Sequence, residues 1–426
     1  MKRRVVITGL GVVSPNGLDL TSFTDALQNG VSGVKFQDRL KELNFSCLIA
    51  GRPEMKDSDV EEFEAKYKLR KIVSSGIYYG CKAGMEAWED AGLDVIEDKK
   101  AAPYWDMGAI MGTTINFLES SRLGINLIDE GHVRKVGASI LLQTMASGVS
   151  AYLGGMIGLG NQITTNSSAC CTGTEAIING YNRIKEGRAK VMLTGSCDSA
   201  TPYSWGAFDS VRLLNRKYND NPEGGSRPMS ASPAGIVPGG GAGVLILEDL
   251  DHALDRNARI YAEILSGDIN SGGQRGGGTM TAANYTAVAR CFNKALTESG
   301  IDKNEIDAIS GHLTGTRGDV AEINAWSKVL ERKGKDFPQI NSLKSLIGHC
   351  FAASGSIESV ACILQLHHGF LHESKNCQVV HTDILNTIDN SCIPHKSKNL
   401  SDLKIMAKSS LGFGDVNSCI IFKKWN

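Results

Sequence analysis

The sequence predicts an α/β protein in which a mostly parallel β-sheet is flanked by helices. Short apolar runs alternate along the chain with helix-length segments, beginning with a run at residues 4–7 and a helical pattern at residues 20–28. Strands separated by segments long enough for a helix tend to return in the same direction, which gives parallel pairing. The composition agrees, because 42% hydrophobic and 21% charged residues are typical of globular proteins and exclude a disordered chain.

The individual elements follow from these runs in chain order. The strands are expected at residues 4–7, 105–111, 162–165, 191–195, 242–248, 260–267, 308–311, 405–409 and 419–423. The helices are expected at residues 20–28, 71–90, 140–157, 171–186, 285–299, 320–330 and 354–367. The basic start followed by an apolar run would also suit a secretory signal, but two glycines and a Ser-Pro pair interrupt it, so we interpret it as the first strand.

A boundary between two halves is expected within residues 251–278. A helix end rich in acidic and basic residues is followed there by the strand at 260–267 and by a glycine run at 272–278. The glycines suit a surface loop, but the strand before them is too apolar for a free linker. The two parts are therefore expected to be halves of one compact unit.

Two glycine motifs resemble nucleotide-binding loops. Gly9 and Gly11 follow the first strand, but Ser14 stands where a dinucleotide fingerprint has its third glycine, and residues 15–17 form a turn where its helix would begin. We interpret this segment as a tight strand-to-turn connection. The run at 239–243 lacks the ending of a phosphate loop, so close backbone packing is expected.

The segment at residues 166–174 has the composition of a reactive-thiol site. Small residues lead from a strand into a helix that begins near Cys170 or Cys171. A thiol at a helix N-terminus lies at the positive end of the helix dipole, which lowers its pKa and favours the nucleophilic thiolate. The other interpretation is a pair of buried structural cysteines, since a disulfide between adjacent residues is strained.

Two histidines lie at the ends of predicted elements elsewhere in the chain. His312 follows the strand at 308–311, and His349 precedes the helix at 354–367. Such positions bring side chains together in α/β folds. A cysteine with histidine partners far apart in the sequence is the spacing of a covalent catalyst assembled by folding. Either histidine alone would more often be a core or loop residue.

These segments, in this order, resemble the β-ketoacyl-[acyl-carrier-protein] synthases, most closely the type II elongating enzymes of the thiolase superfamily. The resemblance covers nearly the whole chain and is carried by residues 4–17, 168–173, 224–228, 312–316, 344–349 and 412–414. It implies a thiolase-like fold, in which two similar halves form an α-β-α-β-α layered sandwich. The expected halves are residues 1–267, with the nucleophilic cysteine, and residues 268–426, with both histidines and a gating loop.

The resemblance also implies roles for individual residues. Cys170 takes the nucleophile position, and His312 and His349 take the two histidine positions of a Cys-His-His triad. Lys344 matches the supporting lysine, with Glu358 as its ion partner. Thr314 and Thr316 match the threonines that bind the pantetheine arm, and Phe413 matches the gating aromatic residue. Ile115 and Phe208 match positions that line the acyl pocket. The backbone N–H groups of Phe413 and Cys170 would form the oxyanion hole.

The implied reaction is a decarboxylative Claisen condensation in fatty-acid, polyene or polyketide chain elongation. An acyl group passes to Cys170, malonyl carrier protein loses CO₂, and the resulting enolate attacks the acyl group. Neutral imidazoles of His312 and His349 donate N–H bonds to the enolate oxygen. The resemblance therefore implies no metal and no diffusible cofactor, because the substrates are carried on the 4'-phosphopantetheine of the acyl carrier protein.

The expected partner is the acidic acyl carrier protein, with no nucleic acid and no membrane. The net charge of -1 gives no general attraction to anions, so a local basic patch is needed, for which Arg70, Lys71 and Arg212 are candidates. A solvated helix start would explain the lysine equally well. The family implies a homodimer, with a heterodimer left open. Eleven scattered cysteines without framework spacing predict reduced thiols and a cytoplasmic location.

Two segments depart from the family pattern. The loop at 312–319 is one residue shorter than usual and has Leu313 where glycine is common, and the gate has Asp415 and Val416 where glycine and threonine are common. These residues restrict the backbone and add charge to a loop that must move. We therefore expect a synthase of a specialised polyene or polyketide pathway.

Two alternatives stay open from sequence. The first is a non-catalytic chain-length-factor-like subunit, although such partners typically lose the nucleophilic cysteine. The second is a coenzyme A-dependent thiolase, which generally uses a second cysteine as base where this chain has His349.

Overall fold

The computed structural model describes residues 3–425, and within them ten strands form one mixed sheet in the order β10-β9-β13-β14-β8-β1-β7-β6-β4-β5. These strands are β1 (Val5–Val13), β4 (Met107–Gly112), β5 (Ile163–Thr164), β6 (Val191–Asp198), β7 (Gly241–Asp249), β8 (Ala262–Ser271), β9 (Ala308–Ser310), β10 (Gln339–Asn341), β13 (Ile405–Gly412) and β14 (Val416–Lys424). Two small sheets pair β2 (Val34–Phe36) with β3 (Ile49–Gly51), and β11 (Phe370–Leu371) with β12 (Lys398–Asn399).

The helices cover the outer faces of this sheet and separate its two halves. They are α1 (Leu20–Gln28), α2 (Asp38–Glu42), α3 (Asp57–Lys66), α4 (Ser75–Asp90), α5 (Leu118–Asp129), α6 (Val133–Gln143), α7 (Gly148–Ile157), α8 (Thr172–Lys185), α9 (Pro202–Ser210), α10 (Leu250–Asp255), α11 (Tyr285–Ser299), α12 (Gly318–Leu330), α13 (Lys344–Ile347), α14 (Ser354–His368) and α15 (Thr382–Leu385).

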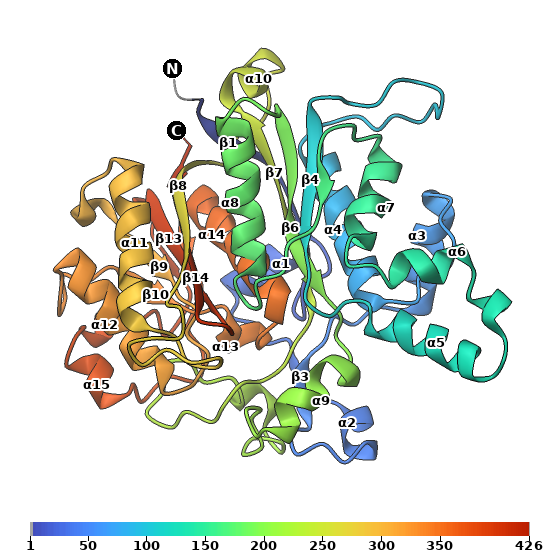
Figure 1. Ribbon diagram of the computed structural model, residues 1–426. Helices are drawn as coiled ribbons and strands as arrows, with labels where there is room; N and C mark the ends of the chain where they lie inside the picture. Colours follow the sequence, from blue (N-terminus) through green and yellow to red (C-terminus); the bar gives the residue numbers. More distant parts are fainter. Residues whose placement is uncertain (1–2, 426) are drawn as a thin grey trace.

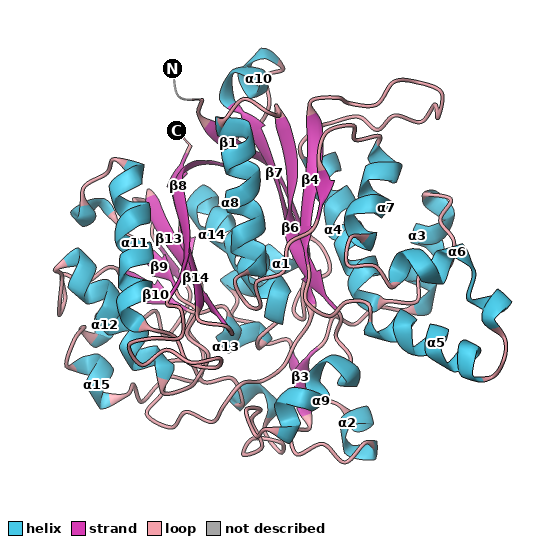
Figure 2. Cartoon of the chain, viewed as in Figure 1, coloured by secondary structure: helices cyan, strands magenta, loops and turns pink. Residues whose placement is uncertain are grey.

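The molecule consists of two halves with the same strand order. The orders β5-β4-β6-β7-β1 and β10-β9-β13-β14-β8 correspond strand for strand, and the halves meet where β1 pairs with β8 over three residue pairs. Helices α8 and α14 lie between the two half-sheets, α4 and α7 cover one outer face, and α11 and α12 cover the other (Figure 1). Figure 2 shows the resulting alternation of helical and strand layers, which confirms the predicted five-layer α-β-α-β-α sandwich.

The prediction of a mostly parallel sheet is wrong. Pairing is parallel along β10-β9-β13 and along β6-β4-β5, but it is antiparallel from β13 through β14, β8, β1 and β7 to β6. The connection between β13 and β14 is only residues 413–415, which is too short for a crossover and forces antiparallel pairing. The direction of a strand depends on such connections, which the alternation of strand and helix patterns does not reveal.

The predicted helix at 140–157 is wrong as a single element. It is divided into the end of α6 and the whole of α7, and α3 and α5 were not predicted. No single helix within residues 3–425 has the length and hydrophobicity of a membrane span, whereas α6 and α7, bent by 76°, meet that test together by length and composition. The predicted division at residue 267 falls inside β8, and we retain it as a proposal.

Gly9 and Gly11 lie inside β1, which extends beyond the predicted strand to Val13, and the predicted turn follows at residues 15–17, where Ser14 and Gly17 exchange backbone hydrogen bonds of 2.8 and 3.3 Å. A Cβ at Gly9 would be 2.2 Å from the carbonyl oxygen of Ala87, and one at Gly11 would be 1.9 Å from that of Ala83. Helix α4 therefore packs directly on the strand, and glycine is required because of this close approach. The motif that resembled a nucleotide loop is a helix-packing motif.

Helices α8 and α14 also touch through small residues. A Cβ at Gly173 would be 2.5 Å from the backbone nitrogen of Ser356, and one at Gly355 would be 2.7 Å from that of Thr174. This close contact between the halves brings together the two segments that precede these helices. One of these segments carries Cys170, and the other carries His349.

Candidate active site

Cys170 lies on the tight turn that enters α8. Ala169 before it has a left-handed φ of +50°, which is unusual for a residue with a Cβ. Thr172 holds this turn, because its hydroxyl accepts the N–H of Ser168 at 2.8 Å and donates to the carbonyl of Ala169 at 2.6 Å. The turn presents Cys170, 9% exposed, to a cavity.

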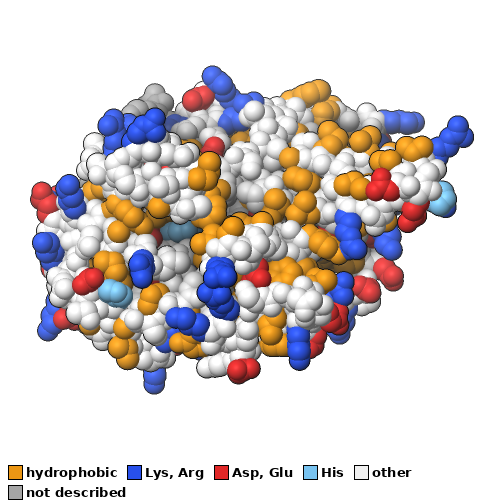
Figure 3. Space-filling view, turned by 60° about the horizontal axis from the view of Figure 1, so that its bottom comes forward, with side chains coloured by type: hydrophobic (Ala, Val, Ile, Leu, Met, Phe, Trp, Pro, Cys, Tyr) orange, Lys and Arg blue, Asp and Glu red, His pale blue; other side chains and the backbone are white. Residues whose placement is uncertain are grey.

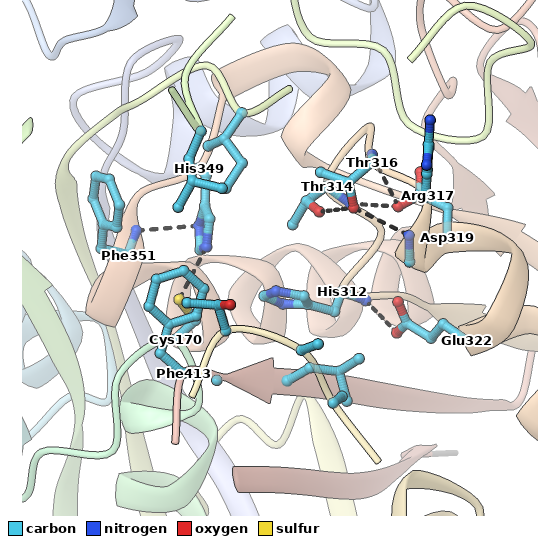
Figure 4. A pocket seen from close by; sticks show the side chains of 18 of the residues that line it. Cys170, His312, Thr314, Thr316, Arg317, Asp319, Glu322, His349, Phe351 and Phe413 are labelled. Atoms are coloured by element: carbon cyan, nitrogen blue, oxygen red, sulfur yellow. Dashed lines mark hydrogen bonds between the residues drawn. The ribbon is translucent and has the colours of Figure 1, made fainter. Parts of the chain in front are cut away.

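The cavity has a volume of about 450 Å³ and is lined from both halves of the chain. Its lining includes Cys170, Phe208, His312, Thr314, Thr316, His349, Phe351 and Phe413. Figure 4 shows His312 and His349 approaching Cys170 from two sides, with Thr314 and Thr316 further along the wall. The fold therefore brings together seven of the residues singled out from sequence, Phe351 being the addition in this list.

Hydrogen bonds fix the tautomer of His349. The backbone N–H of Phe351 donates to Nδ1 at 3.2 Å, and the hydroxyl of Ser354 lies 2.8 Å from the same nitrogen. Since a backbone N–H can only donate, Nδ1 is the acceptor and the neutral ring carries its proton on Nε2. Nε2 lies 3.1 Å from Sγ of Cys170, so His349 donates an N–H toward the sulfur.

His312 is positioned through its backbone. The N–H groups of His312 and Leu313 donate to the carboxylate of Glu322 at 2.8 and 3.0 Å. The two imidazole rings are nearly perpendicular, with centroids 5.3 Å apart. Nδ1 of His312 is buried without a hydrogen-bond partner, and Leu313 has a φ of +21°, a strained value for leucine. The unusual loop therefore still places the ring beside Cys170.

Both imidazoles are uncharged at neutral pH. Burial, followed by the charge of Lys344, lowers the pKa of His312 and of His349 well below the ordinary value of 6.5. Lys408 acts in the same direction on both rings. Neutral imidazoles can donate an N–H without adding a counter-charge to the cavity.

The Cys170 thiol is protonated at rest, so the prediction of a lowered pKa is wrong. Burial raises its pKa to about 12, while Lys344 and a hydrogen bond from the backbone N–H of Phe413 act more weakly in the opposite direction. Because both histidines are neutral, no adjacent imidazolium offsets the burial. The N–H of Phe413 and Nε2–H of His349 nevertheless point at the sulfur, and such donors favour a thiolate.

Lys344 and Glu358 form an ion pair behind the histidines, and each side chain is only 1% exposed. Lys408 of β13 lies 2.9 Å from the second oxygen of the same carboxylate. Sequence reasoning missed Lys408, because its run at 405–409 predicted only a buried strand. A charged residue in the middle of that strand was the available signal.

Two buried carboxylates on α12 also escaped the sequence analysis. Asp319 accepts the N–H groups of Thr314 and Gly315 at 2.9 and 3.1 Å, and Glu322 holds the start of the same loop. Burial raises the pKa of Glu322 to about 7. Their three-residue spacing puts both acids on one helix face, which was the signal that could have found them. The loop they hold carries the hydroxyls of Thr314 and Thr316, 3.1 Å apart.

Other predicted positions lie outside the cavity lining. Ile115 is half-buried, and its N–H donates to Asp198 at 3.1 Å. Arg70, Lys71 and Arg212 are exposed, and Lys71 borders a second cavity of about 330 Å³ beside α3 and α4.

The polar atoms of the three side chains converge on one point of the cavity. The sulfur of Cys170 and one ring nitrogen each of His312 and His349 lie within 4.8 Å of one another. Nitrogen and sulfur ligands at this spacing suit Zn²⁺, and the same arrangement suits a thioester held among a nucleophile and two N–H donors. The expectation that no metal is needed stays a prediction.

Asp415 ties the β13–β14 connection, residues 413–415, to the loop at 272–284. Its carboxylate accepts the N–H of Gln274 at 2.9 Å and that of Asn284 at 2.7 Å, and its own carbonyl accepts the N–H of Gly272 at 2.8 Å. Asp415 is 1% exposed and has a φ of +62°. Asp415, which departs from the family pattern in the segment predicted to be a gate, is thus a buried link between two loops.

We expect Asp415→Ala to lower the free energy of unfolding by about 1–3 kcal/mol, because two backbone N–H groups lose their acceptor. Urea denaturation measures this change. Asp415→Asn keeps one acceptor oxygen and serves as the matched control, with a smaller loss expected. Equal stability of the alanine variant and the unsubstituted protein would show that the link contributes nothing.

The fold and the site together define a condensing acyltransferase of the thiolase-like fold, in which two neutral histidines face a cysteine. Comparison with family models agrees. The β-ketoacyl synthase N-terminal domain matches residues 2–253, and the β-ketoacyl synthase C-terminal domain matches residues 261–378. The chain belongs to the β-ketoacyl synthase family.

Individual relatives match over the full length. The 3-oxoacyl-[acyl-carrier-protein] synthase 2 of Vibrio harveyi is 32% identical, and the match covers 99% of both chains. The chloroplastic 3-oxoacyl-[acyl-carrier-protein] synthase I of Arabidopsis thaliana is 32% identical, with 99% of this chain and 86% of the relative covered.

Two solved structures match over 100% of both chains. One is a type II polyketide synthase acyl-carrier protein in complex with its ketosynthase bound to the hexaketide, with a TM-score of 0.87 and 27% identity. The other is the ishigamide ketosynthase/chain length factor, with a TM-score of 0.86 and 25% identity.

Proposed function

We propose that this protein condenses a Cys170-bound acyl group with malonyl-[acyl-carrier-protein] to give a 3-oxoacyl-[acyl-carrier-protein]. The observation that carries the proposal is the cavity in which Nε2 of His349 lies 3.1 Å from the Cys170 sulfur and the His312 ring lies alongside. The names of the curated relatives support the carrier-bound substrates.

Acyl transfer to Cys170 is the first half-reaction. The sulfur attacks the thioester carbonyl of the acyl carrier, a new C–S bond forms, and the carrier thiol leaves with the proton that Cys170 gives up. The tetrahedral intermediate of this transfer carries an oxyanion. The N–H of Phe413 already faces the sulfur, so the N–H groups of Phe413 and Cys170 are suitably placed to donate to that oxyanion.

Decarboxylation and condensation follow at the same cavity. The C–C bond to the malonyl carboxylate breaks, CO₂ leaves, and the electron pair passes to the thioester oxygen as an enolate. N–H groups of His312 and His349 stabilise this oxygen. The enolate carbon then attacks the acyl carbonyl, the bond to the Cys170 sulfur breaks, and one proton from solvent restores the thiol.

The remaining predicted residues serve substrate binding in this proposal. Thr314 and Thr316 offer hydroxyls to the amides of the pantetheine arm, and Phe413 closes the cavity against Phe208, whose ring centroid is 5.9 Å away. We retain Ile115 as an acyl-pocket residue, although it lies outside the cavity lining. Lys344 and Glu358 support the histidines.

Carrier docking is proposed at the face around the cavity. Figure 3 shows this side of the molecule, with a hollow bordered by hydrophobic side chains and with several Lys and Arg side chains exposed around it. Arg317 is exposed and lines the cavity mouth, and we add it to Arg70, Lys71 and Arg212 as a carrier contact. The solved acyl-carrier protein complex of a relative supports such docking.

Assembly and location follow the relatives in part. We propose a homodimer, and the ishigamide ketosynthase/chain length factor structure keeps a heterodimer as the alternative. Every cysteine within residues 3–425 is a free thiol, which supports a reducing compartment. We propose the cytoplasm, noting that one relative is named chloroplastic.

Mass spectrometry of carrier-bound products tests the function. The purified protein, given acyl and malonyl carrier proteins, should form a 3-oxoacyl carrier protein two carbons longer. Formation of this product only after a second ketosynthase subunit is added would favour the chain-length-factor-like alternative. Comparing saturated, polyene and aryl acyl chains tests the proposed specialised pathway, which a preference for ordinary saturated chains would contradict.

The rate of decarboxylation should change little between about pH 6 and pH 8. The active imidazoles are neutral, and their pKa values lie well below 6.5, so their own protonation inhibits the enzyme only as the pH falls through those lowered values. Glu322, with a pKa of about 7, titrates within this range but bonds the backbone of His312 and not its ring. Release of CO₂ from malonyl carrier protein across this range measures the effect. A severalfold loss of rate between pH 7 and pH 6 would contradict the prediction.

A further inference from the structure

Lys408 is a buried lysine that shares its carboxylate partner, Glu358, with Lys344. Its side chain is fully buried, and its ammonium lies 2.9 Å from Oε2 of Glu358 and donates to the hydroxyl of Ser410 at 3.1 Å. The other oxygen of Glu358 is paired with Lys344. Two ammonium groups therefore share one carboxylate, and the cluster in its ordinary charge states carries a net positive charge.

Within residues 3–425, Glu358 is the carboxylate that contacts Lys408, and the elements packed around it add no second one. The charge of Lys408 affects the pKa of six other groups around it. These groups are Cys362 on α14, Cys419 on β14, Cys171 before α8, Glu322 on α12, and His312 and His349. Burial raises the pKa of all three thiols, to about 12 for Cys362 and Cys419, so they are uncharged. Glu322, whose pKa burial raises to about 7, bonds the backbone N–H groups of His312 and Leu313, whereas both lysines are paired with Glu358. The excess positive charge therefore remains within the cluster.

An excess buried charge is costly for stability. Replacing a whole buried ion pair or triad by apolar residues often leaves a protein equally or more stable, whereas removing one partner of a pair is destabilising because it leaves the other charge uncompensated. Removing Lys408 would leave Lys344 and Glu358 as a balanced pair. Stability therefore does not explain Lys408, and its position beside the reactive centre points to a role in the reaction.

We propose that Lys408 is a positioning residue of the condensation, which together with Lys344 maintains a positive field behind His312 and His349 where the enolate charge develops. This inference rests on the proposed function and deepens it. The field acts through the two imidazoles, since Lys408 does not line the cavity and cannot reach the substrate. Its second effect is on protonation, because both lysines lower the pKa of the histidines.

Removal of the charge has a defined sign. In Lys408→Met the pKa of both histidines rises toward 6.5, so the acid limb of the decarboxylation profile moves to higher pH. Because burial and Lys344 still hold both pKa values below 6.5, the displacement is expected at the acid end of the profile, as an increased ratio of the rate at pH 8 to that at pH 5, and the rate at pH 8 should fall by about tenfold. Acylation of Cys170 should change less, because it forms no enolate.

The experiment compares Lys408→Met with Lys408→Gln, which keeps a donor for Ser410, and with Lys408→Arg, which keeps the charge. Cys419→Ala alters packing beside Lys408 without removing charge and is the matched control. CO₂ release from malonyl carrier protein is measured from pH 5 to 8, and urea denaturation is measured in parallel. In Lys408→Met and Lys408→Gln, the acid limb of the pH–rate profile should be displaced to higher pH while the stability is undiminished. In Lys408→Arg and Cys419→Ala, the acid limb should stay at its original pH.

Two results would overturn the inference alone. One is an unchanged pH profile and rate in both uncharged variants, and the other is a loss of rate that follows a loss of stability without displacement of the acid limb. An unsubstituted protein that releases no CO₂ at any pH would instead overturn the proposed function, so the two failures are distinguishable.

Discussion

Cys170→Ala should lower the rate of chain elongation by about 10³-fold or more, because the variant has no thiol that can form a thioester with the acyl group. Decarboxylation of malonyl carrier protein should remain measurable, since the donors for its enolate are His312 and His349. The substitution therefore separates the two half-reactions. Removing a side chain that is 9% exposed at the cavity wall leaves the turn itself in place, because Thr172 holds that turn through Ser168 and Ala169.

Cys171→Ala is the matched control for this experiment. The thiol of Cys171 donates to the carbonyls of Ser410 and Val416 at 3.2 and 3.3 Å and therefore points to the β13–β14 side and not into the cavity. Intact mass after incubation with acyl carrier protein should show one acyl adduct in the control and none in Cys170→Ala. An adduct that survives in Cys170→Ala would assign the nucleophile to another residue.

The reactive centre could be predicted because each of its residues lies in a short local motif. Cys170 lies among small residues at a helix start, and His349 precedes a segment of small residues. Gly173 and Gly355 allow the two helices to touch, so the composition of each motif also explains how the motifs meet. The ordered motifs, through their resemblance to the family, were therefore sufficient to propose that Cys170, His312 and His349 meet before any distance was known.

Electrostatic states could not be predicted in the same way. The helix start at Cys170 suggested a lowered pKa, but burial is the larger effect and raises it to about 12. Burial results from the packing of both halves around the cavity, which no local pattern describes. Lys408 was missed for a related reason, because its strand was identified from apolar neighbours and its ion partner lies 50 positions earlier, at Glu358.

Fold class and layer order were predictable, whereas strand direction was not. The glycines of β1 illustrate the limit, since the same Gly-x-Gly spacing suits a turn or a strand beneath a helix. Only the proximity of Ala83 and Ala87 on α4 decides between them. Asp415 is similar, because its departure from the family pattern was visible in the sequence, but its link to Gln274 and Asn284 depends on the loop it meets.

Substitution of His349 by alanine should slow decarboxylation on the order of 10²–10³-fold, because the enolate oxygen loses one N–H donor in a buried site. The structure assigns the proton to Nε2, since the backbone N–H of Phe351 occupies Nδ1. His349 thus acts at rest as a donor and not as a base. CO₂ release from malonyl carrier protein measures the loss, and circular dichroism checks that the variant is folded.

His349→Gln distinguishes the two roles, because a glutamine amide can place an N–H near the position of Nε2 but cannot accept a proton at neutral pH. If His349 is a donor, the glutamine variant should recover about tenfold of the rate lost in the alanine variant. If His349 is a general base, both variants should be equally slow and the residual rate should rise with pH. Equal rates in the two variants would therefore contradict the tautomer that the Phe351 hydrogen bond assigns, and with it the donor role in the proposed mechanism.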